Sequence, residues 1–471
     1  MDDFLDHAKR VNEWISDYLK NSGKYPVVAT VQPGDIRKSL PASPPEKAES
    51  FEEIFRDFQE KIIPGVTHWN HPGFFAYFAI TGSAPGILGE MLSAALNING
   101  MLWKTCPAAT ELEEVTLDWL RRMIGFPEAM FGMIMDTAST GTFCAMAAAR
   151  EKLPLQIRKK GMAGRNLPQL RIYASEQTHN SIDKAAIVLG FGQDGIRKIP
   201  ADAEFRMRPD LLRQAIEEDL RFGVQPVCVV ATAGTTSTSS VDPIEAIAEI
   251  CEQHDLWLHV DAAYAGSAAI LPEKRDLFRG AERADSFLFN PHKWLFVPFD
   301  CTAFFTRHPE ILRGAFSLVP EFLRTQEDAS VHNFMDYGIQ LGRRFRALKL
   351  WMVIRMFGVE GLQEAIRKHI RLAQNFAAWV RQSKDFELMA PVPFSLVCFR
   401  AHPNGYAAAR LNDLNLALLE SLNKSGEVYL SHTKLNDHFV LRLAIGNLNT
   451  EERHLLRVQQ LLDSHLQQLL L

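Results

Sequence analysis

Short apolar runs that alternate with helical patterns in the middle of the chain most strongly constrain its fold. A helical pattern separates successive runs, as Ile244–Gln253 does. Buried parallel strands have continuous apolar sequences, and strands that alternate with helices form parallel sheets flanked by helices. The sequence therefore predicts an α/β domain with a mostly parallel central sheet. Its expected strands are Phe131–Met135, Arg171–Ala174, Val227–Ala231, Leu256–Val260 and Ser286–Phe289.

The N-terminal part predicts two helices without a core of their own. Apolar side chains form one helical stripe over residues 4–19 and another over residues 51–62, and a Pro-rich stretch joins them. Both stripes are narrow. We therefore expect the N-terminal helical segment, residues 1–83, to pack on a partner subunit.

The C-terminal part predicts a smaller, mixed domain. A helix from Phe345 to Met356 is expected to stop at Phe357-Gly358. Two strand-like runs, Ser395–Phe399 and Phe439–Ile445, and a Leu-rich helix follow. We expect a large α/β domain over residues 84–348 and a small α+β domain over residues 349–471.

Composition and charge exclude several classes of function. The 471 residues include 51 basic and 56 acidic side chains dispersed along the chain, so we expect no nucleic-acid or membrane partner. No apolar run approaches the roughly 18 residues that a membrane helix needs. The first residues, Met1–Phe4, are acidic, unlike a secretory signal. The 6 cysteines are scattered without a CxxC pair, which indicates reduced thiols, no metal site and a cytoplasmic location.

Polar residues follow three of the predicted strands. Asp261 follows one strand, Asn290-Pro291-His292-Lys293 follows another, and residues 136–141 form a small-residue turn that leads into an Ala-rich helix. Ligands of open α/β sheets bind outside the carboxyl ends of the strands. A helix start can hold a phosphate, a carboxylate can pair with a ring nitrogen, and an amine can form a Schiff base, which together suit pyridoxal 5'-phosphate. Each feature alone also fits a turn, a helix cap or a solvated lysine.

These motifs resemble those of the aromatic-L-amino-acid decarboxylases, the group II pyridoxal-phosphate decarboxylases. The resemblance extends in order over nearly the whole chain. It implies a type I fold of PLP-dependent transferases (aspartate aminotransferase-like), pyridoxal 5'-phosphate as cofactor, an aromatic amino acid as substrate and a homodimer. The matching segments are Pro64–Trp69, Phe74–Phe78, Glu111–Glu113, His259–Tyr264, Asn290–Trp294 and Leu341–Arg346.

The resemblance also implies roles for individual residues. Lys293 would hold the cofactor as a Schiff base, Asp261 would keep the pyridine nitrogen protonated, and His179 would stack on the ring. Without the resemblance, His179 would be read as a satisfied core histidine. The remaining expected cofactor contacts are Ala138, Ser139, Asn290 and His292 at the phosphate, and Thr236 and Ala263.

One position departs from the decarboxylase pattern. Where the family has Pro-x-Tyr-Leu, this chain has Pro320-Glu321-Phe322-Leu323, so the phenol that would return a proton to the substrate carbon is absent. The loop also becomes shorter just beyond, between Leu323 and Gly342. Family members with Phe at this position resemble aromatic aldehyde synthases, which consume O2 and release CO2, ammonia, hydrogen peroxide and an arylacetaldehyde. If Tyr337 or water supplies the proton instead, the product is the amine.

An aromatic-rich set of residues is expected to line the substrate pocket, which favours an aryl substrate. Phe74 in the same stretch is read as core. Gly342 resembles indole-tolerant members of the family, and Ile80 replaces a threonine of many relatives, which makes the pocket more apolar. The expected lining residues are Trp69, Tyr77, Phe78, Ile80, Met101 from the partner subunit, and Gly342.

Three alternatives to an aldehyde synthase stay open at this stage. The first is a decarboxylase that yields phenethylamine, tyramine or tryptamine. The second is a cofactor-binding relative without turnover, which the intact Lys293, Asp261 and His179 disfavour. The third is a glutamate decarboxylase, which the apolar pocket disfavours because a buried substrate carboxylate needs a dedicated cation.

Overall fold

The computed structural model describes residues 3–318, 323, 325–328 and 330–471, which form two compact units. The first unit consists of Met1–Ala79, Asn375–Met389 and Cys398–Leu471, and the second of Ile80–Gln374 and Ala390–Val397. The three-part organisation over residues 1–83, 84–348 and 349–471 stays a prediction. Each unit is described separately below.

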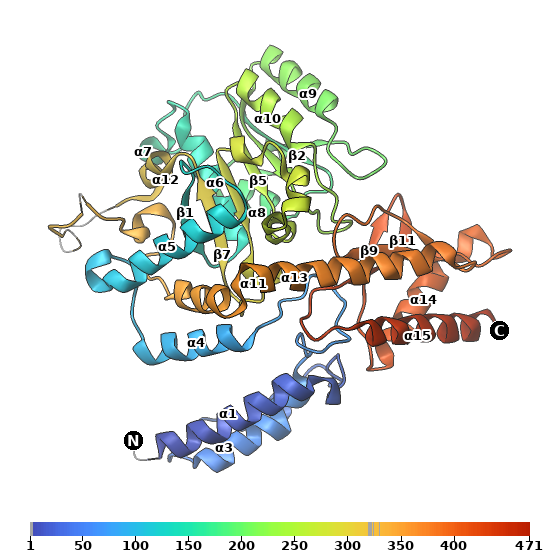
Figure 1. The fold of residues 1–471 in the computed structure, drawn as a ribbon. Coiled ribbons are helices and arrows are strands. Elements are labelled where there is room, and N and C mark those ends of the chain that lie inside the picture. The colour runs from blue at the N-terminus through green and yellow to red at the C-terminus, as the bar shows by residue number, and fades with distance from the viewer. Residues whose placement is uncertain (1–2, 319–322, 324, 329) are drawn as a thin grey trace. The chain divides into compact units, whose positions relative to one another are not determined.

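A seven-stranded sheet forms the centre of the second unit (Figure 1). Its strand order is β1-β7-β6-β5-β4-β2-β3, and the five consecutive strands β6, β5, β4, β2 and β3 run parallel to one another. The predicted mostly parallel sheet is therefore confirmed. The strands are β1 (Phe131–Met135), β2 (Leu170–Ser175), β3 (Ile196–Ile199), β4 (Gln225–Thr232), β5 (Trp257–Asp261), β6 (Ser286–Phe289) and β7 (Thr302–Thr306).

Strand β7 is antiparallel to both of its neighbours, β1 and β6. Only the short helix α11 (Pro291–Trp294) and a loop separate it from β6. A parallel return needs a crossover of a dozen or more residues, usually through a full helix, so this short connection reverses the strand direction. As a result β7 begins at the edge of the sheet where β1 and β6 end.

Helices cover the sheet of the second unit on both faces. All residues of β5, β6 and β7 are buried, and since successive side chains point to opposite faces, both faces must be covered. Helix α6 packs against β4, β5 and β6, while α9 and α10 pack against β4. The helices of this unit include α4 (Ala84–Leu96), α5 (Pro107–Met123), α6 (Ala138–Lys152), α7 (Ile157–Lys160), α8 (Ser181–Val188), α9 (Pro209–Arg221), α10 (Ile244–Gln253) and α12 (Pro309–Phe316).

Helix α6 lies close to the sheet because its inner face is made of small residues. A Cβ added at Gly141 would lie 2.8 Å from Leu288 Cδ2 of β6. Ala145 and Ala148 are fully buried on the same helix. This close packing places the first turn of α6 at the carboxyl end of the parallel strands.

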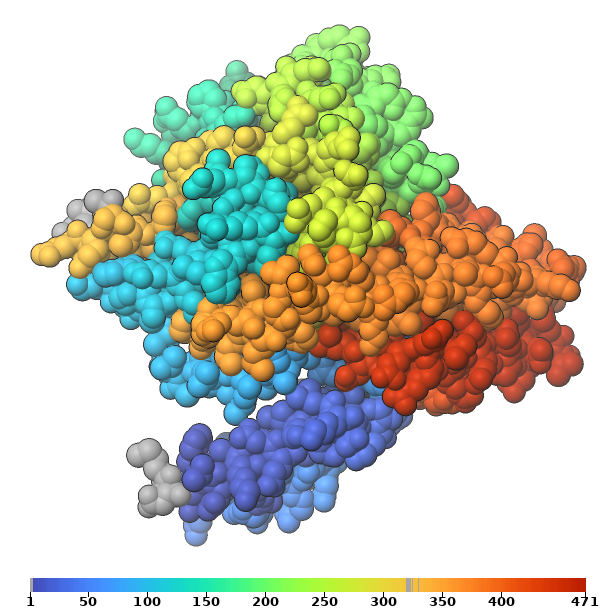
Figure 2. Space-filling model, viewed as in Figure 1, coloured from blue at the N-terminus to red at the C-terminus, as the bar shows by residue number. Residues whose placement is uncertain are grey.

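The first unit contains an N-terminal helix pair and a second sheet. Helices α1 (Phe4–Asn21) and α3 (Phe51–Asp57) contact one another through His7 and Phe51, whose rings stack at 4.2 Å, and neither helix has a buried residue. Figure 2 shows this pair, in blue, packed side by side. In the second sheet, β10 pairs with β11 and β8 with β9, both antiparallel. The further elements are α2 (Asp35–Ser39), β8 (Phe386–Leu388), β9 (Leu396–Ala401), α14 (Leu411–Lys424), β10 (Ser431–Leu435), β11 (His438–Ala444) and α15 (Glu452–Leu470).

The predicted helix stop at Phe357-Gly358 is confirmed as a break in a longer helix. Helix α13 (Arg346–Gln382) has one non-helical residue, Gly358, with φ 66° and ψ 169°. These angles suit glycine and disfavour residues with a Cβ. Within the part of the chain that the structure describes, no helix combines the length and the apolar character that crossing a bilayer requires.

Candidate active site

The nine predicted cofactor residues all belong to the second unit and follow the carboxyl ends of its parallel strands. Asp261 ends β5, and Asn290, His292 and Lys293 follow β6 directly. Ala138 and Ser139 follow β1, His179 follows β2, and Thr236 follows β4. The fold thus gathers residues that are separated by up to about a third of the sequence at one edge of one sheet, as expected for such a fold.

Asp261 supplies the central negative charge of this edge. It is only 4% exposed, and its Oδ1 accepts a hydrogen bond of 3.0 Å from the N–H of Ala263. Burial lowers the pKa of the Lys293 ammonium, and the Asp261 carboxylate opposes that shift. A lowered pKa increases the fraction of Lys293 that is a neutral amine, which is the nucleophilic form.

His179 lies within reach of the charges of Asp261 and Lys293. Removal of water from around its ring lowers the pKa of His179, an effect that Asp261 opposes and Lys293 reinforces. Its Nδ1 accepts the backbone N–H of Ser181 at 3.1 Å. The proton of the neutral ring therefore sits on Nε2, and a neutral imidazole is a suitable flat surface for a ring-shaped ligand. The core-histidine interpretation of His179 does not fit, since the residue is exposed in the isolated chain.

Asn290 and His292 are both oriented by residues at the start of β7. The hydroxyl of Thr302 donates to Asn290 Oδ1 at 2.8 Å, and the N–H of Cys301 donates to His292 Nδ1 at 2.9 Å. Burial lowers the pKa of His292 to about 4, so its ring is neutral with the proton on Nε2. Both side chains thus keep one N–H donor group directed away from β7.

The first turn of α6 offers backbone donors. Thr137 caps the helix by accepting the N–H of Thr140, and Ala138 and Ser139 are the first two residues of the helix. The N–H groups of a first helical turn have no carbonyl acceptor within the helix and carry the positive end of the helix dipole. A cavity of about 290 Å³ adjoins this turn, lined by Ser139, Thr140, Phe143, Ser181, Lys184, Ala185, Val188 and Ile339.

The turn after β4 packs tightly on the segment after β5. Gly234 has φ 87°, and a Cβ there would lie 2.5 Å from Ala265 Cβ. The N–H groups of Gly234 and Thr235 both donate to the Ser240 carbonyl and stabilise the turn. This backbone conformation holds Thr236 at the same edge as Asp261 and Ala263.

The donor set fits pyridoxal 5'-phosphate. A phosphate needs several N–H donors, which α6, Asn290 and His292 provide together, and a pyridinium needs a buried carboxylate, which Asp261 provides. Next to His179, the buried hydroxyl of Thr178 has no hydrogen-bond partner. Because buried polar atoms are nearly always paired, this orphaned group is consistent with a site for a polar ligand.

The predicted substrate residues are divided between the two units. In the first unit, Trp69 stacks with Tyr77 at 5.8 Å between ring centroids, and the Tyr77 hydroxyl lies 3.2 Å from that of Tyr429. Phe78 is buried beneath the guanidinium of Arg442. Phe74 is fully buried, as its interpretation as a core residue requires.

In the second unit, Asn99 connects two predicted substrate residues that the sequence separates. Its amide nitrogen lies 3.5 Å from Met101 Sδ and 3.7 Å from a Cβ added at Gly342. Asn99 was missed by the sequence analysis, since a lone asparagine in a loop gives no signal. Ile80 is partly buried in the same unit, and Phe322 lies outside the described residues.

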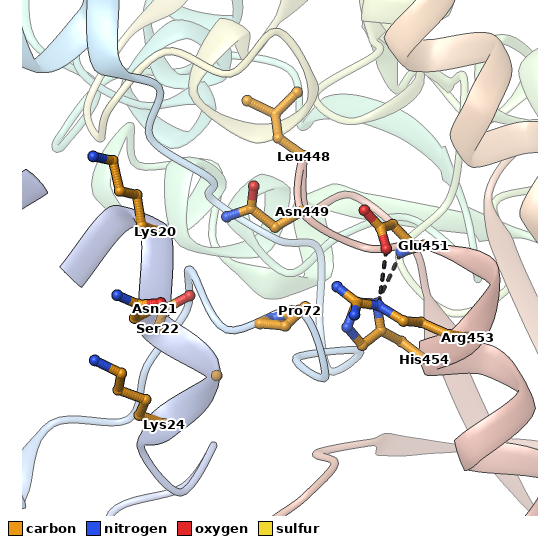
Figure 3. Close-up of a pocket in the computed structure, with 11 residues that line it drawn as sticks. Lys20, Asn21, Ser22, Lys24, Pro72, Leu448, Asn449, Glu451, Arg453 and His454 are labelled. Atoms are coloured by element: carbon orange, nitrogen blue, oxygen red, sulfur yellow. Dashed lines mark hydrogen bonds and ion pairs between the residues drawn. The ribbon is translucent and has the colours of Figure 1, made fainter. Parts of the chain in front are cut away.

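A separate polar cavity of about 670 Å³ lies within the first unit (Figure 3). Lys20 and Lys24 lie on one side of it, and Glu451, Arg453 and His454 lie on the other. Arg453 pairs with Glu451 at 2.9 Å, and the His454 ring accepts the Glu451 N–H. None of the predicted site residues lines this cavity, so the chemistry is assigned to the sheet edge of the second unit.

The fold and the sheet-edge residues together define a pyridoxal-phosphate-dependent enzyme of the type I fold. The model of one family, described as the pyridoxal-dependent decarboxylase conserved domain, matches residues 33–402. The chain therefore belongs to the pyridoxal-dependent decarboxylase family, and the predicted family, fold class and cofactor are confirmed.

Individual relatives match over almost the full length. A phenylacetaldehyde synthase of a hybrid rose cultivar is 40% identical, covering 100% of this chain and 95% of its own length. Tryptophan decarboxylase 2 of Oryza sativa subsp. japonica is 43% identical, with 94% and 90% covered. A crystal structure of Oryza sativa TDC with PLP and tryptamine has a TM-score of 0.96 at 38% identity, covering 99% of this chain and 98% of that chain.

Proposed function

We propose that this enzyme decarboxylates aromatic L-amino acids and oxidatively deaminates them to arylacetaldehydes. One amino acid, one O2 and one water give one aldehyde, one CO2, one NH3 and one H2O2. The observation that carries the proposal is Phe322 in Pro320–Leu323, at the position where the decarboxylases have a proton-donating tyrosine. The similarity to a phenylacetaldehyde synthase supports the same outcome.

The alternative product is the amine. The similarity to enzymes named for tryptophan decarboxylation favours it, and it requires another proton donor. Tyr337 contacts the start of β1, away from the predicted phosphate contacts. Its ring packs 5.0 Å from that of Phe131, the first residue of β1, whereas the predicted phosphate contacts follow the last residue of β1. At about 3.3 Å per residue, the strand separates these two places by more than 10 Å.

Individual residues of this chain have separate roles in the proposed reaction. Bound pyridoxal phosphate supplies a sink for the electrons of the bond to the departing carboxylate. Lys293 attaches the cofactor, Asp261 holds a proton at the ring nitrogen, and His179 covers one face of the ring. Phe322 has no proton to return to the substrate carbon, because a phenyl ring lacks the hydroxyl of tyrosine.

Product analysis under air and under argon tests this proposal. We expect L-phenylalanine or L-tyrosine under air to give aldehyde and peroxide in equal amounts, with O2 consumed in the same proportion. Under argon, turnover should nearly cease. Stoichiometric amine without peroxide under air would establish the simple decarboxylase instead.

The variant Phe322→Tyr restores the missing phenol and so tests the role proposed for this position. We expect it to shift product from aldehyde to amine by at least about tenfold in ratio, within the range that general acid catalysis contributes. Phe222→Tyr is the control, because Phe222 is 78% exposed after α9 and a phenol there should change nothing. An unchanged aldehyde-to-amine ratio in Phe322→Tyr would contradict the assigned role of this position.

A homodimer in the cytoplasm completes the proposal. Large apolar side chains are exposed on two helices, including Phe4 and Leu5 on α1 and Leu88, Leu92 and Leu96 on α4. Exposed apolar faces of this kind are typical of subunit interfaces. The mass of the assembly in analytical ultracentrifugation tests the dimer.

A further inference from the structure

Thr302 is a fully buried threonine that links two parts of the predicted phosphate site. Its Oγ1 donates to Asn290 Oδ1 at 2.8 Å and lies 3.2 Å from the carbonyl oxygen of Asp136. Asn290 directly follows β6. Asp136 begins the turn that leads from β1 into Ala138 and Ser139 of α6.

The contact to Thr302 decides which way the Asn290 amide faces. Because the carboxamide oxygen accepts the threonine proton, the amide NH2 must point away from β7. An amide rotated by half a turn would present its oxygen to the site instead. A carboxamide oxygen repels a phosphate, whereas an NH2 group donates to it.

The neighbouring residue acts on the second side-chain donor in the same way. The N–H of Cys301 donates to His292 Nδ1 and so leaves the His292 proton on Nε2. The start of β7 therefore sets the donor orientation of both Asn290 and His292. An ion pair of 2.7 Å between Asp300 and Arg346 holds the preceding residue in place.

We propose that Thr302 is a positioning residue for cofactor binding, which orients the Asn290 amide toward the phosphate of pyridoxal 5'-phosphate. The proposal rests on the cofactor site assigned above. It predicts that the hydroxyl of Thr302 matters for ligands that carry the phosphate and not for ligands that lack it.

Equilibrium binding to the apoenzyme tests this role without reference to turnover. The dissociation constants of pyridoxal 5'-phosphate and of pyridoxal are measured by absorbance for the wild-type chain and for Thr302→Val. Loss of the hydrogen bond to Asn290 should raise the Kd for pyridoxal 5'-phosphate about tenfold. The Kd for pyridoxal should stay within about twofold.

Thr306→Val is the matched control. Thr306 is the other buried threonine of β7, and its hydroxyl donates to the Asp285 carbonyl at the opposite end of the strand. Thr306→Val makes the same chemical change in the same strand, so the Kd values for pyridoxal 5'-phosphate and for pyridoxal should both stay unchanged. Thr302→Ser, which keeps the hydroxyl, should retain wild-type affinity. If Thr302→Val proves insoluble, Thr302→Ala takes its place with the same expectations.

The variant Asn290→Ala distinguishes two outcomes. In one, Thr302 has no positioning role, and in the other, Asn290 does not contact the cofactor. Asn290→Ala should raise the Kd for pyridoxal 5'-phosphate at least as much as Thr302→Val, and the double variant should lose no more than Asn290→Ala alone. Equal effects of Thr302→Val and Thr306→Val, or an equal loss of pyridoxal affinity, would overturn the role of Thr302. Wild-type affinity in Asn290→Ala would instead remove Asn290 from the cofactor site.

Discussion

Asp261 shows how one buried carboxylate can set the charge state of its neighbours. It opposes the lowering of the pKa of both His179 and Lys293 by burial. The cause lies in the fold, since β5 ends at Asp261 and Lys293 lies in α11, directly after the adjacent strand β6. Carboxylate and amine are brought together by strand order, although 31 residues separate them in the sequence.

Asp261→Asn should keep the shape of the site and remove its charge. The amide oxygen can still accept the Ala263 N–H, so the fold should be retained, whereas kcat should fall by about 100-fold or more, as for other preorganised electrostatic groups. Asp285→Asn is the control, since Asp285 precedes β6 at the opposite end of the sheet and accepts the Leu258 N–H. Similar kcat values for Asp261→Asn and Asp285→Asn would refute the electrostatic role.

At the scale of elements, the position of α6 depends on the absence of a single side chain. Gly141→Ala would place a Cβ 2.8 Å from Leu288 Cδ2 and push the helix away from β6. We expect a loss of about 1–3 kcal/mol of unfolding free energy, as for overpacked cores, together with weaker cofactor binding. Urea unfolding and cofactor titration measure the two effects.

Gly314→Ala provides the comparison for this substitution. Gly314 also lies within a helix, α12, and a Cβ there meets no atom within 4 Å. The substitution should stabilise the protein by about 0.5–1 kcal/mol, because alanine favours helices over glycine. If both substitutions changed stability in the same direction, the close approach of α6 to the sheet would not explain why residue 141 is a glycine.

The N-terminal helices lead to a prediction about assembly. Neither α1 nor α3 has a buried residue, and Phe4, Leu5 and Ile54 expose apolar surface that another subunit could cover. Deletion of residues 1–64 should convert the dimer to monomers or aggregates, detected by light scattering after size-exclusion chromatography. A truncated protein that remains a soluble dimer would show that these helices are not needed for association.

Elements with strong local signals were predicted, and elements defined by tertiary context were not. β1, β6 and α10 have the predicted bounds, because apolar runs or a clear helical period end at turn residues. β3 was missed, since Ile196-Arg197-Lys198-Ile199 is a partly exposed edge strand with only two apolar residues.

The direction of β7 and the role of Thr302 also escaped the sequence analysis. Residues 302–306 read as another apolar run, and only the shortness of the link after β6 signals that the strand is antiparallel. The cofactor residues could be predicted because the family motif marks them, and their individual roles stay predictions. Thr302, which contacts the predicted cofactor residue Asn290, and Asn99, which contacts the predicted substrate residue Met101, carry no motif and are visible only through their contacts.

For the whole molecule, buried neutral histidines predict a loss of stability in acid. Burial lowers the pKa of His71 in the first unit, and of His259 and His292 in the second, to about 4. Each binds fewer protons in the folded chain than in the unfolded chain, so stability decreases as the pH falls from about 6.5 toward 4. Asp242 opposes this trend, because burial raises its pKa to about 6 and acid relieves its charge.

The loss of stability in acid that the three histidines cause should exceed the opposing effect of the Asp242 carboxyl. We expect the urea midpoint to be lower at pH 5 than at pH 7.5, with roughly 1–2 kcal/mol lost per buried histidine. Tryptophan fluorescence follows the transition at both pH values. A midpoint that stays constant or rises at pH 5 would contradict the buried, neutral state of these rings.

The pairing of Ser286 with Thr306 across β6 and β7 makes the intervening segment a closed loop that carries Asn290, His292 and Lys293. Closing so short a loop costs little chain entropy. The segment should therefore acquire protection from deuterium exchange early during refolding, before strands from distant parts of the chain join the sheet. The predicted attachment point of the coenzyme would then be shaped while the remainder of the protein is still assembling.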